Sequence, residues 1–256
     1  MRMFNLALRN LFRNTRRTVL TVAAIGFGLS MMIWTVNFQK GGYNAMIHAG
    51  ISTTAGHVVV QSMGYQEEKE VMMLVHGASD VAARLRAEFP DAVITPRISM
   101  GGLLTSTSTS AGAGLFGIDP AAEQQVQDLH EKIVEGTWLE DDDLEILIGR
   151  AMADSLDVGL GDKLVFMGQN GSDEVQSRMF RVKGIFNTGS TQQDGRLAIV
   201  HLSAAQELMD AEDVAHMVAV HLDEPGESFE AAERAEALLG RDDLEVLNWK
   251  EALPEL

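Results

Sequence analysis

The sequence of 256 residues contains no cysteine, and several familiar chemical signatures are missing as well. Without cysteine there is no disulfide framework, no thiolate metal site and no thiol nucleophile. The chain also has no G-x-x-x-x-G-K-[ST] phosphate-binding loop, no H-E-x-x-H zinc motif and no G-x-S-x-G nucleophile elbow. Basic residues are scarce, 20 against 37 acidic ones, and the net charge of −17 excludes nucleic acid as a partner because its phosphates would be repelled.

The distribution of charge is more informative than its total. No acidic residue precedes Glu67, and the first 17 positions carry Arg2, Arg9, Arg13, Arg16 and Arg17. After them, residues 19–38 are uncharged and mostly apolar. A helix of this length spans roughly 30 Å, the thickness of the hydrocarbon core of a bilayer. The pattern therefore predicts one transmembrane helix, residues 18–40.

The arginines also predict the orientation of this helix. Positive charge marks the cytoplasmic end of a span, so the N-terminus should lie in the cytoplasm and the acidic bulk outside it. We expect Arg9, Arg13, Arg16 and Arg17 to set this topology, from a short amphipathic helix (residues 1–17) that lies in the cytoplasmic interface near lipid phosphates. Two alternatives stay open: the arginines are flanking charge with no further role, or the apolar run is a cleaved signal peptide, which would have a shorter apolar region.

Small residues recur four positions apart along the predicted span. Ala24 and Gly28 are four positions apart, as are Gly26 and Ser30. Such spacing lets two helices approach closely within a bilayer, where packing rather than the hydrophobic effect drives association. We expect Ala24 and Gly28 to pack against another membrane helix.

The remainder of the chain predicts an α+β fold outside the membrane. Helical spacing continues past the span, so residues 41–54 are expected to form a helical stalk. Strand–helix–strand patterns at both ends flank a β-rich middle. We predict an α/β part built from residues 55–120 and 213–248, with an inserted β-rich subdomain, residues 121–212. Within this layout, separate strands are expected over 92–96 and 101–110, and a short helix over 121–129.

Three patterns invite a chemical interpretation, and each has a plainer one. Residues 112–117 match G-x-G-x-x-G, but a Ser/Thr run precedes them and the context is strand then turn, so we predict no dinucleotide site. His216 and His221 are five apart on a predicted strand and should point to opposite faces. The acidic run 140–143 lacks the alternation of a calcium loop and predicts a solvated loop. We therefore predict no catalytic, cofactor-binding or metal-binding residue, and no cofactor.

Several short stretches, in this order and spacing, resemble ABC-transporter permeases of the MacB/FtsX/LolC-LolE type. The opening A-L-R-N-L-F-R-N followed by R-R-T-V-L-T is similar to the start of these permeases. Further stretches resemble the extracytoplasmic domain and the approach to the second span; they are residues 56–61, 64–65, 116–120, 135–138, 148–153, 158–163, 180–186 and 248–251.

The resemblance implies a non-enzymatic permease subunit in the bacterial inner membrane, which couples a separate cytoplasmic ABC ATPase to movement of a periplasmic domain with a porter-like part. It implies as partners that ATPase, a second permease copy or paralogue, membrane lipid, and a lipoprotein or other extracytoplasmic protein. Residues 57–65 look most like the lipoprotein-releasing members. Such permeases have three further spans, so residues 249–256 would be the lead-in to a second span that is missing here. The alternatives are a single-pass anchored adaptor or sensor that binds a partner protein, and an anchored hydrolase.

Overall fold

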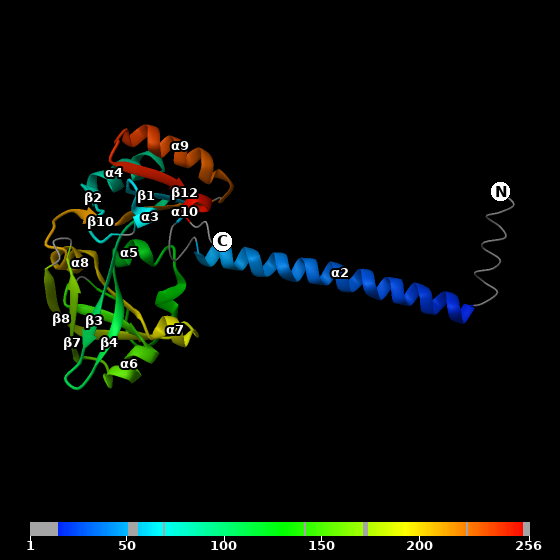
Figure 1. Cartoon of the computed structure of the whole chain (residues 1–256), viewed down its shortest axis with the longest axis horizontal. Helices are drawn as coiled ribbons and strands as arrows, with labels where there is room; N and C mark the ends of the chain where they lie inside the picture. Colours follow the sequence, from blue (N-terminus) through cyan, green and yellow to red (C-terminus); the bar gives the residue numbers. More distant parts are fainter. Residues whose placement is uncertain are drawn as a thin grey trace. The chain divides into compact units, whose positions relative to one another are not determined.

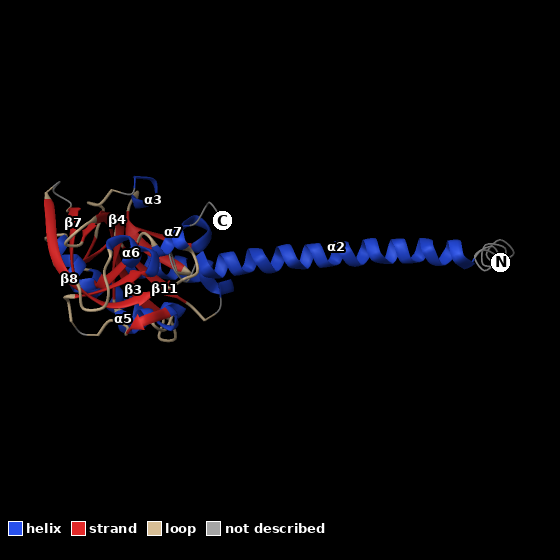
Figure 2. Cartoon of the chain, turned by 90° about the horizontal axis from the view of Figure 1, so that it is seen from below, coloured by secondary structure: helices blue, strands red, loops and turns tan. Residues whose placement is uncertain are grey.

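The computed structural model describes residues 15–50, 56–68, 70–140, 142–170, 174–223 and 225–252. The chain divides into two compact units, residues 1–49 and 50–256, and each is described by itself. We call the second unit the head. All strands of the described residues lie in the head, and the longest helix belongs to the first unit (Figure 1, Figure 2).

The first unit is built on one long helix, α2 (Thr15–Gly50). Its segment Thr15–Gly42 has a mean hydropathy of 2.0 in its most apolar window, and by length and composition it is able to cross a membrane. The predicted span, residues 18–40, lies inside this segment. The helix continues to Gly50, and residues 51–54 of the predicted stalk lie outside the described residues, as do residues 1–14 of the predicted amphipathic helix.

One half of the head is an antiparallel sheet covered by two helices. Strands follow the order β12 (Leu244–Asn248), β1 (Val58–Ser62), β11 (Met217–His221) and β3 (Val93–Thr105). Two amphipathic helices, α4 (Ala78–Glu88) and α9 (Ser228–Leu239), pack on it. Because valines and alanines fill this interface, the helices lie close to the sheet; the buried cluster includes Val58, Val60, Val81, Leu85, Ile94, Val218, Val220 and Ala235.

The other half of the head is a closed ring of six strands. Starting at β3, each strand pairs with the next: β4 (Ser110–Ile118), β9 (Leu197–His201), β6 (Glu145–Gly149), β8 (Val175–Phe186) and β7 (Lys163–Gln169), which pairs back with β3. The six pairings therefore lead back to β3 and close the strands into a barrel-like ring. The helices α6 (Arg150–Leu156) and α8 (Leu202–Leu208) pack into the same core. This core is fully buried at Leu104, Leu115, Phe166 and Phe180.

Short elements complete the head. They are α3 (Tyr65–Glu68), β2 (Val75–His76), α5 (Pro120–Glu123), η2 (Asp128–Lys132), β5 (Ile133–Gly136), α7 (Thr191–Asp194), β10 (Val214–Ala215), η3 (Pro225–Glu227) and α10 (Trp249–Ala252). Residues between α5 and β6 cover one outer stretch of the ring, where Leu129 and Leu139 pack with Leu147, Phe186 and Ile199. The ring takes β3 and β4 from the predicted part 55–120 and its other four strands from the predicted insert 121–212.

The α+β class and the N-terminal apolar helix are confirmed, but two local predictions are wrong. Residues 93–105 form one continuous strand, and the predicted strand 101–110 contains the turn between β3 and β4. The Ser106 hydroxyl accepts hydrogen bonds from the backbone N–H groups of Ser108 and Thr109, a local bond that competes with strand pairing. The predicted helix 121–129 is shorter, because α5 ends at Glu123 and a separate 3-10 turn begins at Asp128.

Candidate functional site

The surface of α2 is the first candidate. Every apolar side chain described along residues 19–38 is exposed, for example Leu20 at 71% and Phe27 at 72%. Ala24 and Gly28 are both exposed, and a Cβ atom added at Gly28 would meet nothing within 4 Å. Arg16 and Arg17 are exposed in the first turn of α2, while Arg9 and Arg13 lie outside the described residues. The roles expected for these residues in topology and helix packing stay predictions.

Three polar side chains within α2 form hydrogen bonds to the helix itself. The hydroxyls of Thr21 and Thr35 donate to the carbonyls of Arg17 and Met31 at 2.9 and 2.8 Å, and the amide of Asn37 donates to Ile33 O at 2.8 Å. Since an unsatisfied polar group in hydrocarbon costs several kcal/mol, this bonding makes these three side chains compatible with a membrane interior.

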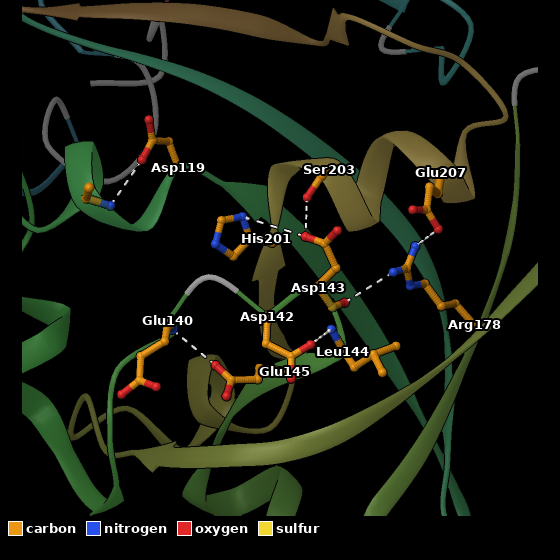
Figure 3. Close-up of polar contacts among 11 residues, drawn as sticks. Asp119, Glu140, Asp142, Asp143, Leu144, Glu145, Arg178, His201, Ser203 and Glu207 are labelled. Atoms are coloured by element: carbon orange, nitrogen blue, oxygen red, sulfur yellow. Dashed lines mark hydrogen bonds and ion pairs between the residues drawn. The ribbon is translucent and has the colours of Figure 1, made fainter.

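In the head, a Ser, a His and an Asp meet in a way that resembles a hydrolase triad. Figure 3 shows Ser203 of α8 and His201 of β9 beside Asp143. The Ser203 hydroxyl donates to Asp143 Oδ1, and His201 Nδ1 lies 4.0 Å from that same oxygen. The hydroxyl proton therefore points to the carboxylate and not to the imidazole, whereas nucleophilic catalysis needs the base on the serine. The geometry fits a structural tie.

The rest of the acidic run is also tied into the fold (Figure 3). Asp142 Oδ1 accepts from Leu144 N at 3.0 Å, and Arg178 on β8 donates to Asp143 O at 3.4 Å while pairing with Glu207 on α8. Residues 140–143 were predicted to be a solvated loop. Glu140 and Asp142 are exposed; Glu140 pairs with Lys183 on β8, and Asp142 bonds only its neighbours in the chain. Asp143 alone is bonded to both α8 and β8.

A buried ion pair that sequence reasoning missed lies between the two halves of the head. Arg97 on β3 donates to the Glu123 carboxylate on α5, with side-chain exposures of 5% and 1%. Gln127 donates to the same carboxylate. Arg97 follows Ile94 of the antiparallel half and precedes Ile98 of the ring core, so the pair lies where β3 passes from one core to the other. No spacing signal in the sequence links positions 26 residues apart.

His216 and His221 were predicted to lie on one strand. His221 is the last residue of β11, and His216 directly precedes this strand, which begins at Met217. His216 is buried: its Nδ1 accepts from Ser99 N at 3.2 Å and its Nε2 donates to Val71 O at 3.1 Å. Burial lowers the pKa of His216. Burial first, and then the charges of Arg97 and His57, lower the pKa of His221 to about 3. His221 is thus neutral at pH 7 and bonds Thr95 at 3.1 Å, which suits a structural role.

Comparison with known proteins gives a consistent family likeness. Residues 18–238 match the family described as MacB-like periplasmic core domain. The chain is 22% identical over 200 residues to the "Lipoprotein-releasing system transmembrane protein LolC" of Neisseria meningitidis serogroup B. That alignment covers 75% of this chain and 46% of the relative, so the chain spans about half the length of the curated relative it matches.

Solved structures share the fold of the head. The periplasmic region of MacB from Actinobacillus actinomycetemcomitans superposes with a TM-score of 0.55 at 17% identity, covering 80% of this chain and 94% of that one. The extracellular domain of the noncanonic ABC-type transporter YknZ from Gram-positive bacteria gives 0.53 at 14% identity, covering 75% and 99%. At these identities the likeness concerns the fold.

Proposed function

Because the chain belongs to the MacB-like periplasmic core domain family, we propose that it is the N-terminal portion of an ABC transporter permease subunit. In this proposal α2 is the first membrane span and the head is the extracytoplasmic domain. Movement generated by a separate cytoplasmic ATPase reaches the head through α2 and its neighbouring spans. The chain itself is not the enzyme, and ATP hydrolysis belongs to the other subunit.

The observation that carries this proposal is the direct succession of a helix with an exposed apolar surface and a head of the MacB periplasmic fold. Along residues 19–38 none of the apolar side chains of α2 is buried, so lipid or other helices must cover them. The head, in contrast, has continuous cores and transmits force as a solid body, since close-packed interiors deform little. A span joined to such a body suits mechanical coupling better than catalysis.

Two finer elements complete the proposal. We place the N-terminus in the cytoplasm and the head in the periplasm, because five arginines lie within the first 17 residues and no acidic residue precedes Glu67. We propose that the transporter releases lipoproteins, and the similarity to the lipoprotein-releasing relative supports this proposal. Protease added to spheroplasts is expected to degrade the head, and protection of the head would contradict the proposed orientation.

Co-purification tests the function most directly. The product of the native reading frame, tagged and extracted from membranes in mild detergent, is expected to bring with it an ABC ATPase and a second permease chain in fixed stoichiometry. Vanadate-sensitive ATPase activity should accompany the complex. Purification of the chain without any ATPase, under conditions in which a known transporter of this type stays intact, would contradict the permease assignment and favour an anchored adaptor.

A substitution in α2 tests the predicted helix contact. Gly28→Leu places a bulky side chain on the Ala24/Gly28 face and is expected to reduce recovery of the partner chains, because close helix approach is lost. Gly26→Leu is the matched control: it makes the same chemical change roughly 200° around the helix, and it too meets open space within the chain. Equal recovery from both variants and from the parent would refute a special role of the Ala24/Gly28 face.

A further inference from the structure

The imidazole of His216 bridges β3 and the segment that precedes β2. The pairing of β11 with β3 begins at Met217, opposite Arg97. Beside this point the Ser99 N–H donates to His216 Nδ1 at 3.2 Å, and on the other side of the imidazole Nε2 donates to Val71 O at 3.1 Å. The residue is 1% exposed, and its own backbone N–H donates to Arg97 O at 2.9 Å. The side chain thus links β3 to a segment with which it forms no strand ladder in the described part of the head.

The two bonding partners fix the protonation state of this imidazole. A backbone N–H can only donate, so Nδ1 must offer its lone pair to Ser99; a carbonyl oxygen can only accept, so Nε2 must carry the hydrogen. A proton added at Nδ1 would set one N–H against another and would bury a charge without a partner. Burial accordingly lowers the pKa of His216, although the bond to Val71 O opposes this shift. The charged form therefore requires the imidazole to leave its place.

Among the described residues, no carboxylate bonds the imidazole and compensates a charge on it. Arg97 of β3 and Glu123 of α5 bind each other, and Asp213, just before β10, accepts from the first turn of α4 at 2.8 Å. From α3 the neighbour is Tyr65, whose ring centroid lies 5.6 Å from that of the imidazole and whose pKa is raised by burial, so it stays neutral. The acidic residues that follow Tyr65 and are described with their side chains are exposed: Glu68 and Glu70. A protonated imidazole thus gains more by reaching water than by staying buried.

The segment on the Val71 side of the imidazole is held more weakly than β3. We call residues 70–74 the strap; it follows α3 and leads into β2 (Figure 1). Its backbone forms a turn in which Met73 N donates to Glu70 O at 3.1 Å, and Met72 is 63% exposed. Val71 and Leu74 are half-buried against the core of the six-stranded ring. On the opposite side β3 is paired with β4 from residue 98 to residue 105, so the strap is the side that yields.

We propose that the strap is an acid-released cover: uptake of one proton by His216 breaks its bond with Ser99, and the strap opens away from the core of the six-stranded ring. Opening uncovers the apolar surface beneath Val71 and Leu74, while β3 and its pairing with β4 stay in place. A buried histidine that is tied to one movable segment is the usual chemistry of a proton-driven switch. The device goes beyond the proposed function, and it lets a head outside the cytoplasm respond to acid.

The stoichiometry of one proton sets how steeply the strap should respond to pH. The closed state has no place for the proton, whereas the released imidazole takes it up with an ordinary pKa of about 6.5. The ratio of open to closed strap should therefore rise about tenfold for each pH unit below 6.5. Above pH 7 the imidazole is neutral in both states, and the ratio should no longer depend on pH.

Hydrogen exchange at single amides tests the switch in the full chain in detergent. The Ser99 N–H is the donor to the imidazole, so its protection factor, corrected for the intrinsic exchange rate at each pH, reports the broken bond directly. The neighbouring Met100 N–H faces β4 because amides alternate along a strand, and it reports the opening of β3 itself. Between pH 7.5 and 5, Ser99 protection should fall at least about tenfold more than Met100 protection. The Met73 amide in the strap should follow Ser99.

Three variants separate the switch from general acid sensitivity. His216→Gln keeps a donor for Val71 O and an acceptor for Ser99 N but takes up no proton, so Ser99 should stay protected at both pH values. His216→Ala removes both bonds, and Ser99 should be weakly protected at both. His221→Gln is the matched control, because it removes the other strongly shifted histidine, which bonds Thr95 and not the strap; the pH response of Ser99 should remain.

The parent chain alone decides the proposal, whatever the variants do to folding. Equal loss of protection at Ser99 and Met100 would mean that acid opens β3 as a whole, and the switch would be wrong. Loss at Ser99 with unchanged protection at Met73 would mean that the imidazole leaves beneath a closed strap, and the cover would be wrong. The same pH response in His216→Gln as in the parent would assign the proton to another group and overturn the role of His216.

Discussion

The helix α2 and the head use apolar side chains in opposite ways. Along α2, residues such as Leu20 and Phe27 are more than 70% exposed, whereas in the ring Phe166 and Phe180 are 0% and 1% exposed. The head satisfies its own hydrophobic surface, and α2 depends on lipid or other helices to cover its surface. Removal of an apolar side chain should therefore cost much more stability in the head than on α2.

The largest expected effect on stability follows from the removal of a phenyl side chain from the core of the six-stranded ring. Phe166→Ala should lower the free energy of unfolding of the head by about 3–5 kcal/mol, since a buried phenyl is lost and a cavity remains. Phe27→Ala makes the same change on α2 and should alter the free energy of unfolding of the head by less than about 0.5 kcal/mol. Urea titration of the full chain in detergent, followed by tryptophan fluorescence, measures both. Similar losses in the two variants would contradict the contrast.

A second contrast compares a buried ion pair with an exposed one. Glu123→Gln leaves the charge of Arg97 buried without its carboxylate and should cost about 3 kcal/mol. Glu135→Gln removes the partner of Arg150 in a pair whose side chains are 32% and 46% exposed, and it should cost at most about 0.5 kcal/mol. The same urea titration applies. A cost below about 1 kcal/mol for Glu123→Gln would mean that the pair does not hold the two cores together.

The ion pair also marks where sequence reasoning reaches its limit. Hydropathy and charge along α2 are local signals, and they predicted the N-terminal apolar helix. The three consecutive valines of β1, Val58 to Val60, are a local signal of the same kind, because β-branched residues favour a strand. The closure of the ring depends on β7 pairing with β3, some 60 residues away, and no local pattern encodes that pairing. The contact between Arg97 and Glu123 likewise depends on the tertiary fold, which brings α5 against β3. The turn at residues 106–109 was not predicted, because alternating Ser and Thr residues are also typical of a strand. What makes the turn is the Ser106 hydroxyl, which accepts hydrogen bonds from the backbone N–H groups of Ser108 and Thr109.

Acid should destabilise the head through its buried histidines. The pKa of His221 is about 3 in the folded chain and about 6.5 when unfolded, so the unfolded state binds the proton first as the pH falls. Stability is therefore fully present above pH 6.5 and is lost between pH 6.5 and about 3. Between pH 7 and 5, protonation of His221 in the unfolded state should lower the free energy of unfolding by about 2 kcal/mol. The pKa of His216 is also lowered in the folded head, so His216 adds a loss in the same direction.

A pair of variants isolates the contribution of His221. His221→Gln keeps a hydrogen-bonding group beside Thr95 but cannot take up a proton, so the difference in unfolding free energy between pH 7 and 5 should shrink by about 2 kcal/mol. The exposed Gln192→Asn, which removes no titratable group, should leave that difference unchanged. An unaltered pH dependence in His221→Gln would show that this imidazole is not excluded from protonation in the folded head.

The smallest expected effect contrasts two glycines of the same strand, both within the G-x-G-x-x-G letters. A Cβ at Gly117 would lie 2.3 Å from the Cβ of Ala205, so this glycine lets α8 approach β4 closely. Gly117→Ala should cost about 1–2 kcal/mol, because the helix must shift to relieve the overlap. At Gly112 nothing lies within 4 Å, and Gly112→Ala should instead stabilise the strand by about 0.5–1 kcal/mol. Opposite signs for the two substitutions would establish helix packing as the reason for Gly117, whereas equal stabilisation would remove it.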